Sequence, residues 1–265
     1  MTVREYGASG PTLILMHGGP GAQGSMAPVA RVFADSFHVL EPFQRVESTT
    51  VAAHAADLDE LVQSRCAGGW PVIVGHSWGA MLTLAYAAEH PESTRALVLI
   101  ASGTFDKLAR DKLESTIRAK FDPQLRARFD RLERDFPDPN ARYREVGRLL
   151  MPLYSFDLIS DDTESAVPDY VAEAQASEAS WNDMVRLQES GVYPAAFRAI
   201  RAPVLMLHGA DDPHPGHMIR DSLAPHLPQL EYREWEKCGH YPWLERHARD
   251  EFFATLREWL ARHRV

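Results

Sequence analysis

Residues 71–81 constrain the fold of this chain more than any other stretch of its sequence. Apolar residues lead into the pentapeptide Gly-His-Ser-Trp-Gly at residues 75–79, and the residues up to 88 are apolar at helical spacing. We therefore predict a buried strand, a sharp turn and a helix. Ser77 would lie at the apex of the turn, with its hydroxyl exposed beside the unpaired N–H groups of the helix, where an oxyanion would be stabilised. An ordinary strand–helix turn is the alternative interpretation.

Strands and helices alternate through most of the remaining chain. This alternation predicts an α/β fold with a mostly parallel, doubly wound sheet, because parallel strands need helical crossovers that cover both faces. Strands are expected at 12–16, 37–41, 96–100, 203–208 and 229–234, and helices at 25–33, 50–62, 217–227 and 245–261.

The alternation is interrupted between residues 105 and 197, which lack a convincing buried strand. This region reads as a series of charged, aromatic-rich helices at 108–121, 123–136, 142–154 and 171–189. We therefore predict a core made of residues 1–104 and 198–265, with a helical cap at 105–197 inserted after the strand that ends near Ile100.

Composition excludes several classes of protein. With 45% hydrophobic and 25% charged residues in a chain of 265, global disorder is not expected. The net charge of −9 and the absence of Lys/Arg runs argue against nucleic acid as a partner. No apolar leader or long apolar run occurs, so a cytoplasmic protein without a membrane partner is expected. The cysteines, Cys66 and Cys238, lack metal or redox spacing, and no metal or cofactor is expected; composition does not predict the oligomeric state.

A serine nucleophile needs a base to accept its proton and a carboxylate to orient that base. The loop after the strand at 203–208 carries Asp211 and Asp212, and the loop after the last strand carries His240. The order of nucleophile, acid and base matches that of a known hydrolase topology. Either aspartate could instead cap the following helix, and Asp106 is a weaker alternative acid.

These motifs resemble those of α/β-hydrolase-fold serine hydrolases over nearly the whole chain. By this resemblance, residues 75–79 form the nucleophile elbow and His240 lies in the base loop. The Gly209-x-x-Asp212 spacing of the acid loop favours Asp212 over Asp211. The resemblance thus implies the catalytic residues Ser77, Asp212 and His240.

Within that family, the sequence His-Gly-Gly-Pro-Gly at residues 17–21 and the elbow resemble the proline iminopeptidase group. This resemblance implies an oxyanion hole formed by the backbone N–H groups of Gly19 and Trp78. The group usually carries Asp-Gln-Arg-Gly-x-Gly-x-Ser after the following strand, whereas residues 42–47 here read Pro-Phe-Gln-Arg-Val-Glu and lack its glycines.

We therefore expect a cofactor-free serine hydrolase that cleaves small or medium carboxylic esters through an acyl-enzyme. The alternatives are an aminopeptidase similar to proline iminopeptidases, acting on amides, and a non-catalytic ligand-binding homologue. Aromatic residues that could line the substrate pocket, or equally pack in the core, are Trp181, Tyr154, Phe156 and Tyr193. Acids available to bind a substrate amine are Glu173, Glu178, Asp183 and Glu189.

Overall fold

Seven strands form one sheet in the computed structural model, which describes residues 1–66, 69–159 and 173–263. The strands are β1 (Thr2–Tyr6), β2 (Thr12–Met16), β3 (His38–Phe43), β4 (Val72–His76), β5 (Ala96–Ile100), β6 (Val204–Gly209) and β7 (Leu230–Trp235). Their order across the sheet is β1-β3-β2-β4-β5-β6-β7. Only the β1–β3 pair is antiparallel within this sheet. The predicted α/β fold with a mostly parallel, doubly wound sheet is confirmed.

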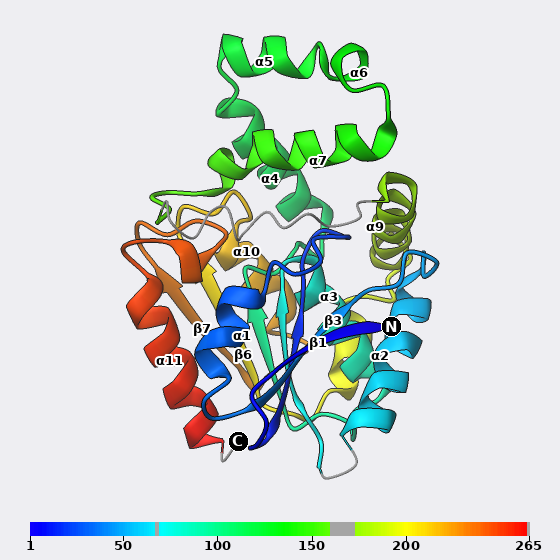
Figure 1. The fold of residues 1–265 in the computed structure, drawn as a ribbon, viewed down its shortest axis with the longest axis vertical. Coiled ribbons are helices and arrows are strands. Elements are labelled where there is room, and N and C mark those ends of the chain that lie inside the picture. Colours follow the sequence, from blue (N-terminus) through cyan, green and yellow to red (C-terminus); the bar gives the residue numbers. More distant parts are fainter. Residues whose placement is uncertain (67–68, 160–172, 264–265) are drawn as a thin grey trace.

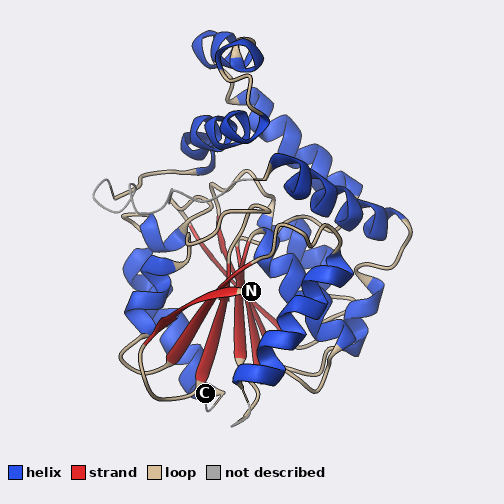
Figure 2. Ribbon diagram, turned by 45° about the vertical axis from the view of Figure 1, so that its right-hand side comes forward, coloured by secondary structure: helices blue, strands red, loops and turns tan. Residues whose placement is uncertain are grey.

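Helices cover both faces of the sheet (Figure 2). One face packs against α1 (Ala27–Phe33) and α11 (Arg249–Arg262), and the other against α2 (Val51–Arg65), α3 (Trp78–Glu89) and α10 (Gly216–Leu223). Successive side chains of a strand point to opposite faces, so Ile73 joins the core of the second face while Val72 and Val74 join that of the first. This double coverage explains why β4 and β5 are buried at every residue.

The position of β4 fixes the position of Ser77. β4 is the middle strand of the sheet, between β2 and β5, and Gly75 pairs with both Met16 and Leu99. Ser77 follows directly at the carboxyl end of this strand, where the loops after the neighbouring parallel strands also converge.

Two elements differ from the sequence prediction at the ends of the core. Strand β1 was not predicted, because it lies at the edge of the sheet with most of its residues exposed and so carries no buried apolar run. Helix α11 begins at Arg249 rather than at 245, because η3 (Pro242–Leu244) precedes it and the Glu245 side chain is buried away from solvent.

The described residues between β5 and β6 are mainly helical, and their helices extend beyond one end of the sheet at the top of Figure 1. The segment predicted as one helix at 123–136 is two helices, and residues 171–172 of the last predicted helix lie outside the described residues. The helices of this region are α4 (Lys107–Ala119), α5 (Pro123–Phe129), α6 (Leu132–Asp135), α7 (Pro139–Leu150), η1 (Met151–Tyr154), α9 (Ala174–Glu189) and η2 (Ala195–Ala199).

The contact between α3 and β2 requires glycine at position 79. A Cβ on Gly79 would lie 2.3 Å from the carbonyl oxygen of Met16 and 2.6 Å from that of His17. Gly75 is similarly enclosed, because its Cβ would lie 2.3 Å from the carbonyl oxygen of Gly79. The two glycines therefore allow the helix to begin close against the sheet.

We expect Gly79→Ala to destabilise the protein, because backbone atoms of β2 must move to admit the methyl group. The melting temperature should fall by at least ~5 °C, which corresponds to about 2 kcal/mol of overpacking in a chain of this size. Gly147→Ala is the control, since Gly147 is exposed within α7 and alanine is favoured there. Equal melting temperatures for Gly79→Ala and the unchanged protein would contradict this account of the elbow.

Candidate active site

Ser77 stands in a backbone conformation that side chains rarely adopt, with φ 53° and ψ −116°. Its N–H donates to the carbonyl of Ile100 at 2.9 Å, and its carbonyl accepts from the N–H of Ala80 at 3.0 Å. The turn is thus anchored to β5 on one side and to the first turn of α3 on the other. Such strain at an apex between strand and helix is typical of a serine whose hydroxyl is presented for reaction.

Ser77 opens into a cavity of about 830 Å³. The core contributes residues from the loops after β2, β4, β6 and β7, and helices α7 and α9 close the opposite side. Residues from the core loops that line the cavity include Gly18, Gly19, Ser77, Trp78, His214, His240 and Tyr241. Residues from the inserted helices include Arg142, Tyr143, Arg144, Arg148, Tyr154, Glu178 and Trp181.

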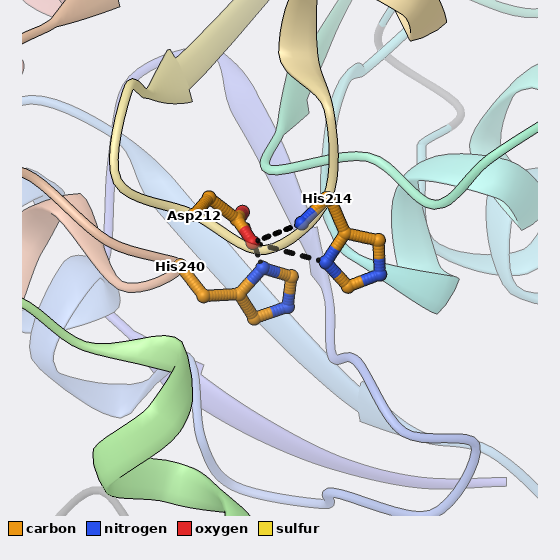
Figure 3. Close-up of side chains that lie close together, drawn as sticks. All are labelled: Asp212, His214 and His240. Atoms are coloured by element: carbon orange, nitrogen blue, oxygen red, sulfur yellow. Dashed lines mark hydrogen bonds and ion pairs between the residues drawn. The ribbon is translucent and has the colours of Figure 1, made fainter. Parts of the chain in front are cut away.

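The loops after β6 and β7 bring Asp212 and His240 together (Figure 3). His240 Nδ1–H donates to Asp212 Oδ2 at 2.6 Å, and both residues are buried. Burial alone raises the pKa of Asp212, but His240 and His214 outweigh it and hold that pKa well below the ordinary value of 3.8. Burial lowers the pKa of His240 below 6.5, although Asp212 opposes this shift. His240 is therefore neutral at pH 7, as a general base must be.

His214 shares the Asp212 carboxylate with His240. Its backbone N–H and its Nδ1–H donate to Asp212 Oδ1 at 2.9 and 3.0 Å, and its ring stacks on that of His240 at 4.6 Å between centroids. The sequence reasoning missed His214. The signal available was a histidine two residues after the candidate acid, in a loop at the carboxyl end of a strand.

Two further histidines pack beneath this pair. His76 Nε2–H donates to the carbonyl of His240 at 3.0 Å, and His208 Nε2–H donates to the carbonyl of His214 at 3.0 Å. Burial lowers the pKa of both His76 and His208, so both rings are neutral at pH 7. They support the two loops through neutral hydrogen bonds.

The two backbone N–H groups expected to bind an oxyanion border the same cavity. Gly19 lies in the loop after β2, and Trp78 is the first residue of α3, where the N–H has no partner within the helix. Gln44 links the two sides, because its amide donates to the carbonyl of His17 at 3.2 Å and accepts from Trp78 Nε1–H at 3.0 Å. Gln44 directly follows β3 and belongs to the segment 42–47, which lacks the glycines of the iminopeptidase motif.

Glu245 holds the base loop and was also missed by sequence reasoning. Its buried carboxylate accepts from the N–H groups of Gly239 and Phe156 at 3.0 and 2.9 Å through Oε1, and from that of Asp157 at 2.7 Å through Oε2. In addition, the N–H of His240 donates to the carbonyl of Tyr154 at 2.7 Å. The base loop is therefore tied to residues 154–157 of the inserted segment, at and after η1.

The other residues expected at the site are placed differently. Asp106 caps α4, since its Oδ1 accepts from the N–H of Ala109 at 2.8 Å. Tyr154 and Trp181 line the cavity. Tyr193 is buried against Phe197, which is the core alternative considered for it. Phe156 neither lines this cavity nor packs in the core, because it is 48% exposed.

Of the four acids considered for binding an amine, Glu178 lines the cavity. Glu173 accepts from Asn140 Nδ2–H, and Asp183 accepts from the N–H of Val51 at the start of α2. Glu189 is exposed near Arg110. These three carboxylates serve the packing of the helices instead.

In the described part of the chain, one group of side chains has metal-ligand character: Asp212, His214 and His240. The ligand atoms that lie together are those joined by the hydrogen bonds described above. A cation would displace the Nδ1 protons of both imidazoles, so the arrangement fits a protonated hydrogen-bonded triad better than a metal site.

None of the helices in the described ranges has the length and apolar character needed to cross a membrane.

The chain belongs to the alpha/beta hydrolase family, whose sequence profile matches residues 13–255. It is similar to a proline iminopeptidase of Lactobacillus helveticus, with 25% identity over 96% of this chain and 90% of that protein. The predicted similarity to that group is thus confirmed.

Solved structures share the fold. MenH from S. aureus has a TM-score of 0.70 at 18% identity, covering 100% of this chain and 98% of its own. A thermophilic esterase from Thermogutta terrifontis has a TM-score of 0.69 at 19% identity, covering 100% and 94%. A proline iminopeptidase from Mycobacterium smegmatis has a TM-score of 0.65 at 18% identity, covering 98% and 94%.

We expect Asp212→Asn to slow the labelling of Ser77 by a fluorophosphonate by at least ~10²-fold, because an amide cannot hold His240 in the tautomer that a base requires. Asp211→Asn is the matched control, since Asp212 and not Asp211 contacts His240. The labelling rate is measured by mass spectrometry of the intact protein and of its peptides. Similar rates for the two variants would show that the acid is assigned wrongly.

We expect Glu245→Gln to lower the stability of the protein by about 2 kcal/mol, because the new amide group faces a backbone N–H donor and leaves it unpaired. Thermal unfolding followed by circular dichroism measures the change. Glu258→Gln on α11 removes the same charge at an exposed position and should leave the melting temperature unchanged. A melting temperature as high for Glu245→Gln as for Glu258→Gln would show that the hydrogen bonds of the Glu245 carboxylate do not stabilise the base loop.

Proposed function

We propose that this protein is a serine hydrolase that cleaves small or medium carboxylic esters through an acyl-enzyme. The reaction takes place between the core, residues 1–104 and 198–265, and a helical cap, residues 105–197. The proposal is supported by the strained turn at Ser77, the Asp212–His240 hydrogen bond, and the shared cavity that Ser77 and His240 line.

In this proposal, Ser77 Oγ attacks the ester carbonyl while His240 Nε2 accepts the hydroxyl proton. The N–H groups of Gly19 and Trp78 bind the negative oxygen of the tetrahedral intermediate. His240 then gives its proton to the leaving alcohol, and the acyl group remains on Ser77. Water, activated by the same imidazole, releases the acid and restores the serine. Asp212 keeps the Nδ1 proton on His240 throughout.

The charged side chains that line the cavity favour an uncharged ester over a substrate with a protonated amine. Glu178 is the one carboxylate among the described lining residues, and it is exposed. Three arginines, Arg142, Arg144 and Arg148, line the same cavity from α7. Only Arg148 of these has a carboxylate partner among the described residues, Glu145. A protonated amine needs opposing carboxylates when it leaves water, whereas an uncharged ester makes no such demand.

An aminopeptidase similar to proline iminopeptidases is the second candidate. It is favoured by the similarity to the Lactobacillus helveticus protein over nearly the whole chain. Glu178, on α9, is then the residue that would bind the substrate amine. The non-catalytic alternative is disfavoured, because the proposed nucleophile, base and oxyanion donors line one cavity and the proposed acid accepts a hydrogen bond from the base.

We expect kcat/KM for p-nitrophenyl butyrate to exceed that for proline p-nitroanilide by ~10²-fold or more, because an unpaired ammonium group costs several kcal/mol in this cavity. Proline p-nitrophenyl ester is the control, since it separates recognition of the amine from the easier chemistry of an aryl ester. Ser77→Ala should remove turnover of all three compounds while it preserves the melting temperature.

Glu178→Gln distinguishes the two candidates directly. It should leave butyrate turnover within about tenfold of the unchanged protein, some 1.4 kcal/mol in barrier. Glu189→Gln, outside the cavity, is the matched control. If the prolyl compounds are preferred, and Glu178→Gln alone abolishes that preference, the protein is an aminopeptidase.

A further inference from the structure

The reaction centre contains a second imidazole that the proposed mechanism does not use. His214 is buried, lines the cavity and donates from Nδ1 to the same carboxylate that orients His240. The interplanar angle between the two rings is 16°. Figure 3 shows both rings with Nδ1 turned toward Asp212 and Nε2 on the side away from it. If the His214 side chain only filled space, it would need neither a hydrogen bond to Asp212 nor a ring parallel to that of His240.

We propose that His214 is a positioning residue, which holds the Asp212 carboxylate in one rotamer and keeps the His240 ring turned with Nε2 toward the cavity. This inference rests on the proposed function, because it assigns a role within the same reaction. It concerns hydrogen bonds in the resting protein, however, and these can be measured without any substrate.

The contacts of Asp212 explain how His214 fixes the carboxylate. Oδ1 accepts both hydrogen bonds from His214, and Oδ2 accepts the shorter one from His240. Rotation about the carboxylate bond would break all three, so the two histidines restrain the acid from opposite sides. The stacked ring of His214 also blocks one face of the His240 imidazole and limits its rotation.

His214 has an electrostatic effect on the base as well. A donor to Oδ1 withdraws negative charge from Asp212, so the carboxylate stabilises protonated His240 less. Loss of that donor should therefore raise the pKa of His240, and the base would become protonated at a higher pH.

The surroundings isolate this effect. The other titratable side chains that face the two rings belong to the end of β4, the end of β6, η1 and the base loop: His76, His208, Tyr154 and Tyr241. Burial lowers the pKa of His76 and of His208, and raises that of Tyr154. These three groups are uncharged near neutral pH. Among the described residues, Asp212 is the charged side chain that accepts a hydrogen bond from both rings.

Two variants separate the hydrogen bond from the ring. His214→Asn places an amide N–H where Nδ1–H lies but removes the ring, whereas His214→Phe keeps a flat ring and removes the donor. The backbone N–H bond to Oδ1 remains in both. The rate of fluorophosphonate labelling of Ser77 between pH 4.5 and 9 measures the basicity of His240. Melting temperature and near-ultraviolet circular dichroism verify the fold.

For His214→Phe we expect the acidic limb of the labelling profile to move to higher pH by ~0.5 unit, and for His214→Asn to stay within ~0.2 unit of the unchanged protein. The plateau rate of His214→Asn should fall several-fold, because the His240 ring loses its stacking partner. A profile of His214→Phe that coincides with that of the unchanged protein would overturn the proposal, as would an equal shift in both variants.

A nuclear magnetic resonance spectrum of the unchanged protein tests the His214–Asp212 hydrogen bond even if a variant fails to fold. With ¹⁵N-labelled histidine, downfield Nδ1–H resonances are expected from His240 and His214, beside that of His17, whose Nδ1–H donates to the Gly18 carbonyl at 2.9 Å. The His214 resonance alone should be absent in His214→Asn. If His214 Nδ1 carries no proton, the proposal is wrong. If Ser77 is not labelled in the unchanged protein, the proposed function fails instead, while this spectrum still tests the His214–Asp212 bond.

Discussion

The contact between the start of α3 and the end of β2 is the constraint on which the rest of the site depends. The backbone at Gly79 approaches the Met16 and His17 carbonyls so closely that a methyl group would not fit. This approach turns Ser77 out of the sheet and sets the free N–H of Trp78 beside the loop that carries Gly19. One backbone contact therefore brings the proposed nucleophile and both proposed oxyanion donors to the same cavity.

A buried negative charge organises the other half of the site. Asp212 is removed from water, so its carboxylate is stable only while hydrogen bonds from His214 and His240 compensate the lost hydration. That requirement binds the loops after β6 and β7 to each other. Glu245 acts in the same way on the far side of the base loop, where its carboxylate collects three backbone N–H groups. Two buried carboxylates thus hold the position of His240.

The inserted helices are attached to the oxyanion side of the site as well as to the base loop. Tyr143 O–H and Ser177 Oγ–H both donate to the carbonyl of Pro20, at 2.8 and 3.1 Å, in the loop that contains Gly19. The same helices supply the arginines and Glu178 that line the cavity. The proposed catalytic residues therefore belong to the core, whereas α7 and α9 supply most of the charged side chains that line the cavity.

The sequence by itself determined the strand–turn–helix unit at Ser77, the alternation that defines the sheet and the loops that carry Asp212 and His240, because these depend on short apolar runs and on neighbouring glycines. It did not predict β1, whose exposed edge position leaves no apolar pattern. Only the tertiary structure decided which aromatic residues reach the cavity, and which polar residues support it, as His214 and Glu245 do. Their roles depend on partners that the packing of separate elements brings close, such as the His214 and His240 rings. The local sequence around each residue does not indicate which distant residues become its neighbours.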